Sequence, residues 1–277
     1  MAYLSRVGGH IPLEGYLSKE ISKNSKSDKK KKTGVFAYKP KITSTFAPRN
    51  NLVDIETMTI TFANQKGGVG KTSLLILFSH YLSALRKDKI LMIDADHQRS
   101  LLNQRKVDQE NFPDCDFGGD IIELNLEEPS VVGEFMEELR GETEPVLIDA
   151  PGNLTEPGLI QVLAYSDVIV VPYQYENKVL ESSGTFISVI AQLREKLEIS
   201  PKLFFVPNRI KTGVGLKNEK SHWAEIDEIF ARHGTVTPLV KDLVCFSRVN
   251  TITITKEQSE QTKNCFDLIY TKVCLEK

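Results

Sequence analysis

The feature that most constrains this chain is a glycine- and lysine-rich loop at residues 65–73, with the sequence Gln-Lys-Gly-Gly-Val-Gly-Lys-Thr-Ser. The β-branched residues of Thr57–Ala63 precede it and predict a buried strand. Apolar residues follow at helical spacing over Lys71–Leu85. Glycines let the backbone turn so that successive N–H groups face an anion, and a helix N-terminus adds partial positive charge. The segment therefore predicts a phosphate-binding loop between a strand and a helix.

The side chains of this loop indicate binding of a nucleoside triphosphate with magnesium. The Lys71 ammonium can reach the β- and γ-phosphates, and the Thr72 hydroxyl is a ligand that Mg²⁺ accepts. An unrelated glycine-rich turn is the alternative, and the Gly-Lys-Thr sequence with these flanks argues against it. The expected nucleotide-binding residues are Gly67, Gly68, Val69, Gly70, Lys71, Thr72 and Ser73.

Strand-like and helix-like patterns alternate along the rest of the chain. Short apolar runs typical of buried strands lie at Ile90–Ile93, Val146–Ile148, Val168–Val171 and Leu203–Val206. Helical patterns lie at Ser130–Leu139, with Ser130 as the N-cap, and at Val179–Leu197, Ser221–Arg232 and Lys256–Leu275. Residues 106–129 are expected to be irregular. This alternation predicts an α/β fold, a mostly parallel twisted sheet with helices on both faces, which binds ligands at the carboxyl ends of its strands.

Charge separates the first part of the chain from the rest. Residues 1–50 contain 11 Lys and Arg against three Asp and Glu, whereas the remainder contains 24 against 34. Four consecutive lysines, Lys29 to Lys32, lie among Ser and Asn, a composition that cannot bury enough apolar area to order itself. We expect residues 1–56 to be a basic, flexible extension and residues 57–277 to be the folded domain. The extension either contacts nucleic acid or an acidic partner, or is a solvated tail.

Composition also excludes several classes of protein. No apolar run approaches the ~18 residues of a membrane span, and the N-terminus lacks the apolar core of a signal peptide. The four cysteines are scattered without a C-x-x-C pair, which favours reduced, mostly buried thiols over a metal site: Cys115, Cys245, Cys265 and Cys274. A cytoplasmic protein is expected.

Two aspartate motifs follow predicted strands. Asp94 and Asp96 end the second strand, and Asp149 ends the strand before Ala-Pro-Gly. Carboxylates at this edge would repel a triphosphate, so bound Mg²⁺ and ordered water must compensate. Asp149 is expected to hold Mg²⁺ through water, and the Pro151–Gly152 turn to respond to the γ-phosphate as a switch. For Asp96, a plain helix cap is the alternative.

The loop sequence Lys66-Gly-Gly-x-Gly70-Lys71-Thr72 resembles the deviant Walker A loop of the ParA/MinD family, and the resemblance extends over residues 57–275. Gln65 stands where the general pattern has glycine. The resemblance implies a P-loop ATPase in which Lys66 reaches the phosphates of a partner subunit. It implies that Asp94 supports the magnesium water shell, through water, and that Asp96 positions the attacking water. The proline usual after that second aspartate is His97 here, so the local loop geometry is left open.

The segment Phe205–Arg209 resembles the family segment whose asparagine reads the adenine edge. Asn208 suits that edge because its amide both donates and accepts, although an ordinary turn residue is the competing interpretation.

The family resemblance implies an ATP-dependent homodimer with weak, partner-stimulated ATP hydrolysis. Such a switch would position DNA of a plasmid, chromosome or mobile element, with a ParB-like adaptor as its partner, in the cytoplasm or at the nucleoid. Non-specific DNA binding would use basic residues of the C-terminal half: Lys202, Arg209, Lys211, Lys217, Lys220, Arg232, Lys241, Arg248, Lys256 and Lys263. The alternatives are a MinD-like membrane-associated ATPase and a non-hydrolysing ATP-dependent scaffold.

Membrane attachment is disfavoured because the apolar residues of the C-terminal segment are expected to pack on the core: Phe266, Leu268, Ile269, Val273 and Leu275. Iron-protein relatives of nitrogenase need two cluster cysteines near the nucleotide, and none lies between Asp116 and Val244. A ligase of the dethiobiotin synthetase type would need a further polar constellation, which the sequence does not present.

Overall fold

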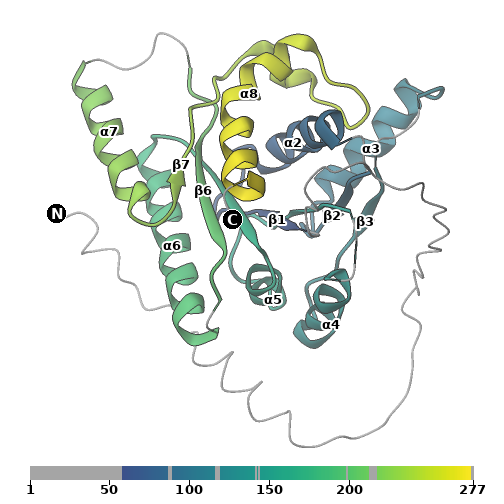
Figure 1. Cartoon of the computed structure of the whole chain (residues 1–277), viewed down its shortest axis with the longest axis horizontal. Helices are drawn as coiled ribbons and strands as arrows, with labels where there is room; N and C mark the ends of the chain where they lie inside the picture. The colour runs from purple at the N-terminus through teal and green to yellow at the C-terminus, as the bar shows by residue number, and fades with distance from the viewer. Residues whose placement is uncertain are drawn as a thin grey trace, which may run out of the picture. The chain divides into compact units, whose positions relative to one another are not determined.

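The computed structural model describes residues 58–86, 89–115, 119–140, 142, 144–197, 199–211 and 217–275. Within them, seven parallel strands form one sheet in the order β3-β2-β4-β1-β5-β6-β7. Figure 1 labels β1, β2, β3, β6 and β7 of this sheet. The strands are β1 (Thr59–Phe62), β2 (Leu91–Asp94), β3 (Ile121–Glu123), β4 (Val146–Asp149), β5 (Val168–Tyr173), β6 (Lys202–Pro207) and β7 (Thr235–Val236). The expected α/β fold with a parallel sheet is therefore confirmed.

Helices connect the strands and close the chain. They are α2 (Lys71–Arg86), α3 (Ser100–Asn111), α4 (Pro129–Leu139), α5 (Leu159–Ala164), α6 (Asn177–Leu197), α7 (Lys217–Ala231) and α8 (Lys256–Tyr270). A 3₁₀ helix, η2 (Val244–Arg248), precedes α8, and a π-helical turn, η3 (Thr271–Leu275), follows it. None of the helices in the described part of the chain has both the length and the apolar run that a membrane span needs.

Two hydrophobic clusters cover the two faces of the sheet. Helices α2, α3 and α8 contribute to one cluster, and α4, α5, α6 and α7 contribute to the other. Strand β4 illustrates the division, because Leu147 faces the first cluster while its neighbours Val146 and Ile148 face the second. Phe266 and Ile269 of α8 are 1% exposed, so the C-terminal helix packs on the core as expected. The side chain of Leu275 lies outside the described residues.

Two expectations about the less apolar segments were wrong. Residues 106–129 are not irregular throughout, because α3 continues to Asn111 and β3 forms the edge of the sheet. Ser130 is not the N-cap of α4; Glu128 occupies that position without a side-chain hydrogen bond, and Pro129 begins the helix. The expected basic extension at residues 1–56 lies outside the described residues.

The strand order places the carboxyl ends of β2, β4 and β1 side by side. In the parallel register Asp94 pairs with Asp149, and Asp149 in turn pairs with Phe62. The loop after β1 and the aspartates that end β2 and β4 therefore share one edge of the sheet.

Candidate functional site

The loop between β1 and α2 is held in a conformation that glycine alone adopts easily. Gly68 and Gly70 have φ angles of 80° and 91°. A Cβ on Gly70 would lie 2.4 Å from Asn208 Nδ2, so the position has neither the backbone freedom nor the space for a larger residue. Val69 anchors the loop because its side chain is fully buried in the core. The loop thus presents its backbone between fixed points at the sheet edge.

A buried carboxylate lies directly behind this loop. The Thr72 hydroxyl donates a 2.6 Å hydrogen bond to Asp149 Oδ2, while the buried Oδ1 atom has no hydrogen-bond partner among the described residues. Burial raises the pKa of Asp149 to about 7, although the Thr72 hydrogen bond and the charge of Lys71 oppose the increase. Asp149 is 1% exposed, so an unmatched negative charge here is costly. The site therefore favours a proton or another positive charge beside Oδ1.

The cationic side chain of Lys71 interacts with Asp149, and it is also buried. Burial lowers the pKa of its ammonium, and the negative charges of Asp149 and Asp96 raise it in partial compensation. The interaction with both aspartates means that the loop lysine and two predicted carboxylates share one electrostatic environment. Lys66 and Ser73, on either side, are half-buried.

Asp94 and Asp96 have different surroundings. Asp94 is fully buried, and its carboxylate accepts hydrogen bonds from the backbone N–H groups of Asp96 at 3.2 Å and Leu102 at 3.0 Å. Burial raises the pKa of Asp94, and these N–H donors counteract the shift. The carboxylate that accepts a hydrogen bond from the first turn of α3 is therefore that of Asp94. Asp96 Oδ1 accepts from the backbone N–H of Gln98 instead, so the helix-cap alternative for Asp96 was wrong.

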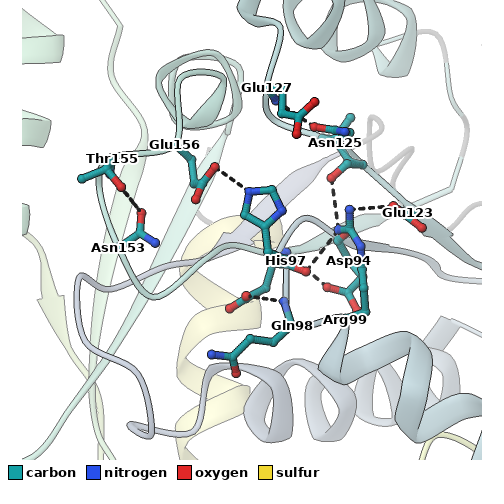
Figure 2. A network of polar contacts seen from close by, with 12 residues as sticks. Asp94, His97, Gln98, Arg99, Glu123, Asn125, Glu127, Asn153, Thr155 and Glu156 are labelled. Carbon is teal, nitrogen blue, oxygen red and sulfur yellow. Dashed lines mark hydrogen bonds and ion pairs between the residues drawn. The ribbon is translucent and has the colours of Figure 1, made fainter.

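Arg99 holds this carboxylate loop and was not identified from the sequence. Its Nη1 atom donates to the carbonyls of Asp94, Asp96 and Leu124 at 3.0, 3.1 and 3.3 Å, and its Nη2 atom lies 2.6 Å from Glu123 Oε1 (Figure 2). Arg99 has a φ of 51°, a left-handed conformation that costs energy in a residue other than glycine. No motif marks such a residue, because its role depends on contacts to three separate carbonyls.

Asn208 connects the end of β6 to the phosphate loop. Its Nδ2 atom donates to the Val69 carbonyl at 2.8 Å, and its backbone N–H donates to the Tyr173 carbonyl at 2.8 Å. The adjacent Arg209 has a φ of 58° and donates from Nη1 to the Gly68 carbonyl at 2.8 Å. Asn208 is therefore more than a turn residue, because it supports the loop from the end of β6.

A pocket of about 360 Å³ opens beside these residues. It begins at Gly70 and Ser73 on the loop and continues along Asn208 to the segment that contains Asp242 and Phe246. Its lining is mixed, with apolar side chains beside amide, guanidinium and carboxylate groups. The residues after position 240 carry no recognisable sequence motif, which is why they were not predicted. A planar, polar-edged group attached to a bound phosphate would fit this position.

The sequence match decides the family. The family described as CobQ/CobB/MinD/ParA nucleotide binding domain matches residues 60–247, which is more than half of the chain. The chain belongs to this family. The resemblance to ParA/MinD proteins that the loop sequence indicated is thereby confirmed.

Individual relatives agree with the family assignment. The chain is 32% identical over 165 residues to the chromosome-partitioning ATPase Soj of Thermus thermophilus, a match that covers 52% of this chain and 65% of Soj. The match thus spans less than two thirds of that relative. A plasmid partition protein of Borrelia burgdorferi, solved with AMPPNP, superposes with a TM-score of 0.59 at 20% identity, over 78% of this chain and 99% of that one. A McdA variant of Cyanothece, solved with ATP, superposes with a TM-score of 0.60 at 18% identity, over 78% of this chain and 95% of that one. These two structures share the fold.

The residues of this CobQ/CobB/MinD/ParA-type domain fit a magnesium ion that a nucleotide would complete. The described residues contain no group of three His, Cys, Asp or Glu side chains that could hold a metal by themselves. Thr72 and Asp149 nevertheless offer hard oxygen donors side by side, and Oδ1 of Asp149 is buried and unsatisfied. Mg²⁺ commonly binds through one or two protein oxygens, with phosphates and water as its other ligands. The donor set agrees with that type of site.

The raised pKa of Asp149 generates a stability prediction for the nucleotide-free protein. The folded chain holds a proton on Asp149 that the unfolded chain releases above pH ~4, so its free energy of unfolding should fall as pH rises toward 7. Asp149→Asn removes this dependence. As pH rises from 5 to 8, we expect the free energy of unfolding of the variant to increase by about 2–3 kcal/mol relative to that of the native chain. Urea unfolding of both proteins at both pH values measures the gain. Parallel pH profiles would contradict the assignment.

Proposed function

We propose that this chain is an ATP-dependent dimerisation switch that hydrolyses ATP slowly and positions DNA. One observation carries the proposal, the Thr72–Asp149 contact with an unsatisfied carboxylate oxygen behind the phosphate loop. That arrangement suits a magnesium–triphosphate complex better than a lone anion, since a lone anion would add negative charge beside three aspartates. The names of the relatives support ATP as the nucleotide, because Soj is called an ATPase and the two structures contain AMPPNP and ATP.

Phosphate binding would be shared between the loop backbone and Lys71. Phosphoryl transfer depends on position and charge neutralisation more than on covalent chemistry. The backbone N–H groups from Gly67 to Ser73 would face the phosphate oxygens, and the buried Lys71 ammonium would neutralise their charge. Asn208 would read the adenine edge from the pocket beside Gly70, with Nδ2 already oriented by the Val69 carbonyl.

Hydrolysis requires a group that orients the attacking water. Asp96 is suited to this role because its carboxylate lies within electrostatic range of Lys71 and is half-buried at the sheet edge. Magnesium, when bound, would neutralise charge on the phosphates, and Thr72 together with Asp149 and Asp94, the latter two through water, would hold it. Asp94 is the most restrained of the three, since two backbone N–H groups fix its carboxylate.

DNA binding would use some of the ten basic residues identified in the C-terminal half of the sequence. Lys202 begins β6 and Arg209 follows the end of that strand, so these two basic residues are separated by the length of β6. Lys256 and Lys263 each pair with an acidic residue four positions later in α8. Three exposed residues remain near the pocket: Lys211, Lys241 and Arg248, of which Lys241 is bridged through its backbone to Ile210. We propose this group as the contact for DNA phosphates.

We propose that residues 1–56 form a basic extension to a domain at 57–277, that the protein acts in the cytoplasm or at the nucleoid, and that a ParB-like adaptor stimulates hydrolysis. A membrane-bound mode has less support, because the apolar side of α8 is occupied by the core.

The cross-dimer role of Lys66 can be tested by substitution. We expect Lys66→Ala to keep most of the affinity for ATP, since Lys71 and the loop backbone remain, but to lose the ATP-dependent dimer. Light scattering with and without Mg-ATP measures the change in mass, and Lys211→Ala provides a control with another lysine removed outside the loop. A dimer of undiminished stability in the Lys66→Ala variant would rule out this role.

Turnover and DNA binding test the switch itself. We expect purified protein with Mg-ATP to release phosphate slowly, below the ~10 s⁻¹ typical of enzymes. ATP should retain the protein on duplex DNA of any sequence at low salt, and ADP should not. Retention should fall steeply as salt is raised. Binding of ATP without any phosphate release, alone or with DNA, would favour the non-hydrolysing scaffold instead.

A further inference from the structure

Asp96 sits at the first position of a tight turn. The backbone N–H of Arg99 donates to the Asp96 carbonyl at 2.9 Å, which closes a four-residue turn, and the Asp96 side chain accepts from Gln98 N–H at 3.0 Å. Aspartate is favoured at the first position of such turns, and proline at the second, because its ring fixes φ near the required value. The second position here is His97, which has no such covalent restraint.

The His97 side chain makes a contact that proline could not make. Its Nε2 atom lies 2.7 Å from Glu156 Oε2 (Figure 2). A carboxylate oxygen only accepts when ionised, so Nε2 carries the proton and donates. The His97 side chain is 49% exposed, whereas that of Glu156 is only 13% exposed. The acceptor is thus held largely within the protein, and the histidine approaches it from the solvent side.

Glu156 is presented by a segment that is fixed at both ends. At one end, a Cβ on Gly152 would lie 3.1 Å from the Gly67 backbone nitrogen and 3.5 Å from Lys71 Nζ, so this glycine packs against the phosphate loop. At the other end, Gly158 N–H donates to the Leu126 carbonyl at 2.8 Å.

Between these anchors, the side chain of Asn153 organises the turn that leads to Glu156. Its Oδ1 atom accepts from Thr155 N–H at 3.0 Å and from the Thr155 hydroxyl at 2.9 Å. The backbone of Glu156 is therefore held by this turn, which begins close to Asp149.

We propose that the His97–Glu156 hydrogen bond is a positioning contact that replaces the restraint of the proline usual in the family and couples the Asp96 loop to the turn after Asp149. It rests on the proposed ATP hydrolysis. Arg99 restrains the inner side of the Asp96 loop through the Asp94 and Asp96 carbonyls, and His97 restrains its outer side. The orientation of Asp96 then depends on the position of a turn that contacts the phosphate loop. In a protein with proline at 97, that dependence would be absent.

Steady-state ATP hydrolysis of paired variants tests the proposal. We expect His97→Ala and Glu156→Ala each to lower kcat about three- to tenfold with KM for ATP within twofold, the range that one charge-assisted hydrogen bond can supply. The double Ala variant should lose no more than either single variant. His97→Gln, which keeps an N–H donor, and His97→Pro, which restores the covalent restraint, should both recover turnover. Adding Glu156→Ala to His97→Pro should then have no further effect.

A second His–Glu pair provides the matched control. His222 and Glu225 lie 3.6 Å apart on α7, and both are strongly exposed, so His222→Ala should leave kcat unchanged. Nitrogen-15 NMR of the imidazole adds a readout that does not need activity: His97 should show protonated Nε2, with a resonance that shifts in Glu156→Ala.

Three results would overturn the coupling: native-like kcat in His97→Ala, an equal loss from Glu156→Ala in the His97→Pro background, or an imidazole resonance insensitive to Glu156→Ala. Each leaves ATP hydrolysis by the native chain intact. Absence of turnover in the native chain would instead refute the proposed function, and the coupling with it, so the two failures can be told apart.

Discussion

The hydrogen bond between the Thr72 hydroxyl and the buried Asp149 carboxylate is the constraint on which the site depends. It joins the first turn of α2 to the end of β4, and the other oxygen of this buried carboxylate has no hydrogen-bond partner in the part of the chain that the structure describes. Burial raises the pKa of Asp149 to about 7, which means that the free site is close to taking up a proton at neutral pH. A bound cation would satisfy the same oxygen. Local instability of the free site and the proposed affinity for a metal–nucleotide complex would thus have one physical origin.

Every other part of the site is arranged around this contact. Register pairing brings Asp94 beside Asp149, and Asn208 supports the loop through the Val69 carbonyl. Gly152 packs against the loop from the side of β4. In the proposed coupling, a change at bound phosphates would displace the segment that carries Glu156 and, through His97, would alter the position of Asp96. Such contacts between loops are what a nucleotide-dependent switch requires.

The sequence predicted the parts of the structure that local patterns encode. Buried strands such as β4 and β5 and the loop at 65–73 were found because their apolar or glycine patterns are strong. The polar helix α3 was missed, since its start is stabilised by the Asp94 carboxylate rather than by a capping residue next to it in sequence. The short strand β3 lies at the sheet edge, where three residues give too weak an alternation to recognise. Arg99 acts through backbone carbonyls, whose positions only the folded chain defines.

Calorimetric titration of Mg-ATP into the purified full chain and into Lys71→Ala tests nucleotide binding by the phosphate loop. We expect saturable binding by the native chain and loss of that binding in the variant, because the ammonium and the loop backbone act on the same phosphates. An exposed lysine on α7, Lys220, provides the control substitution and should leave the affinity unaltered. Failure of the native chain to bind Mg-ATP, or equal affinity in Lys71→Ala, would contradict binding of the triphosphate by Lys71 and the loop.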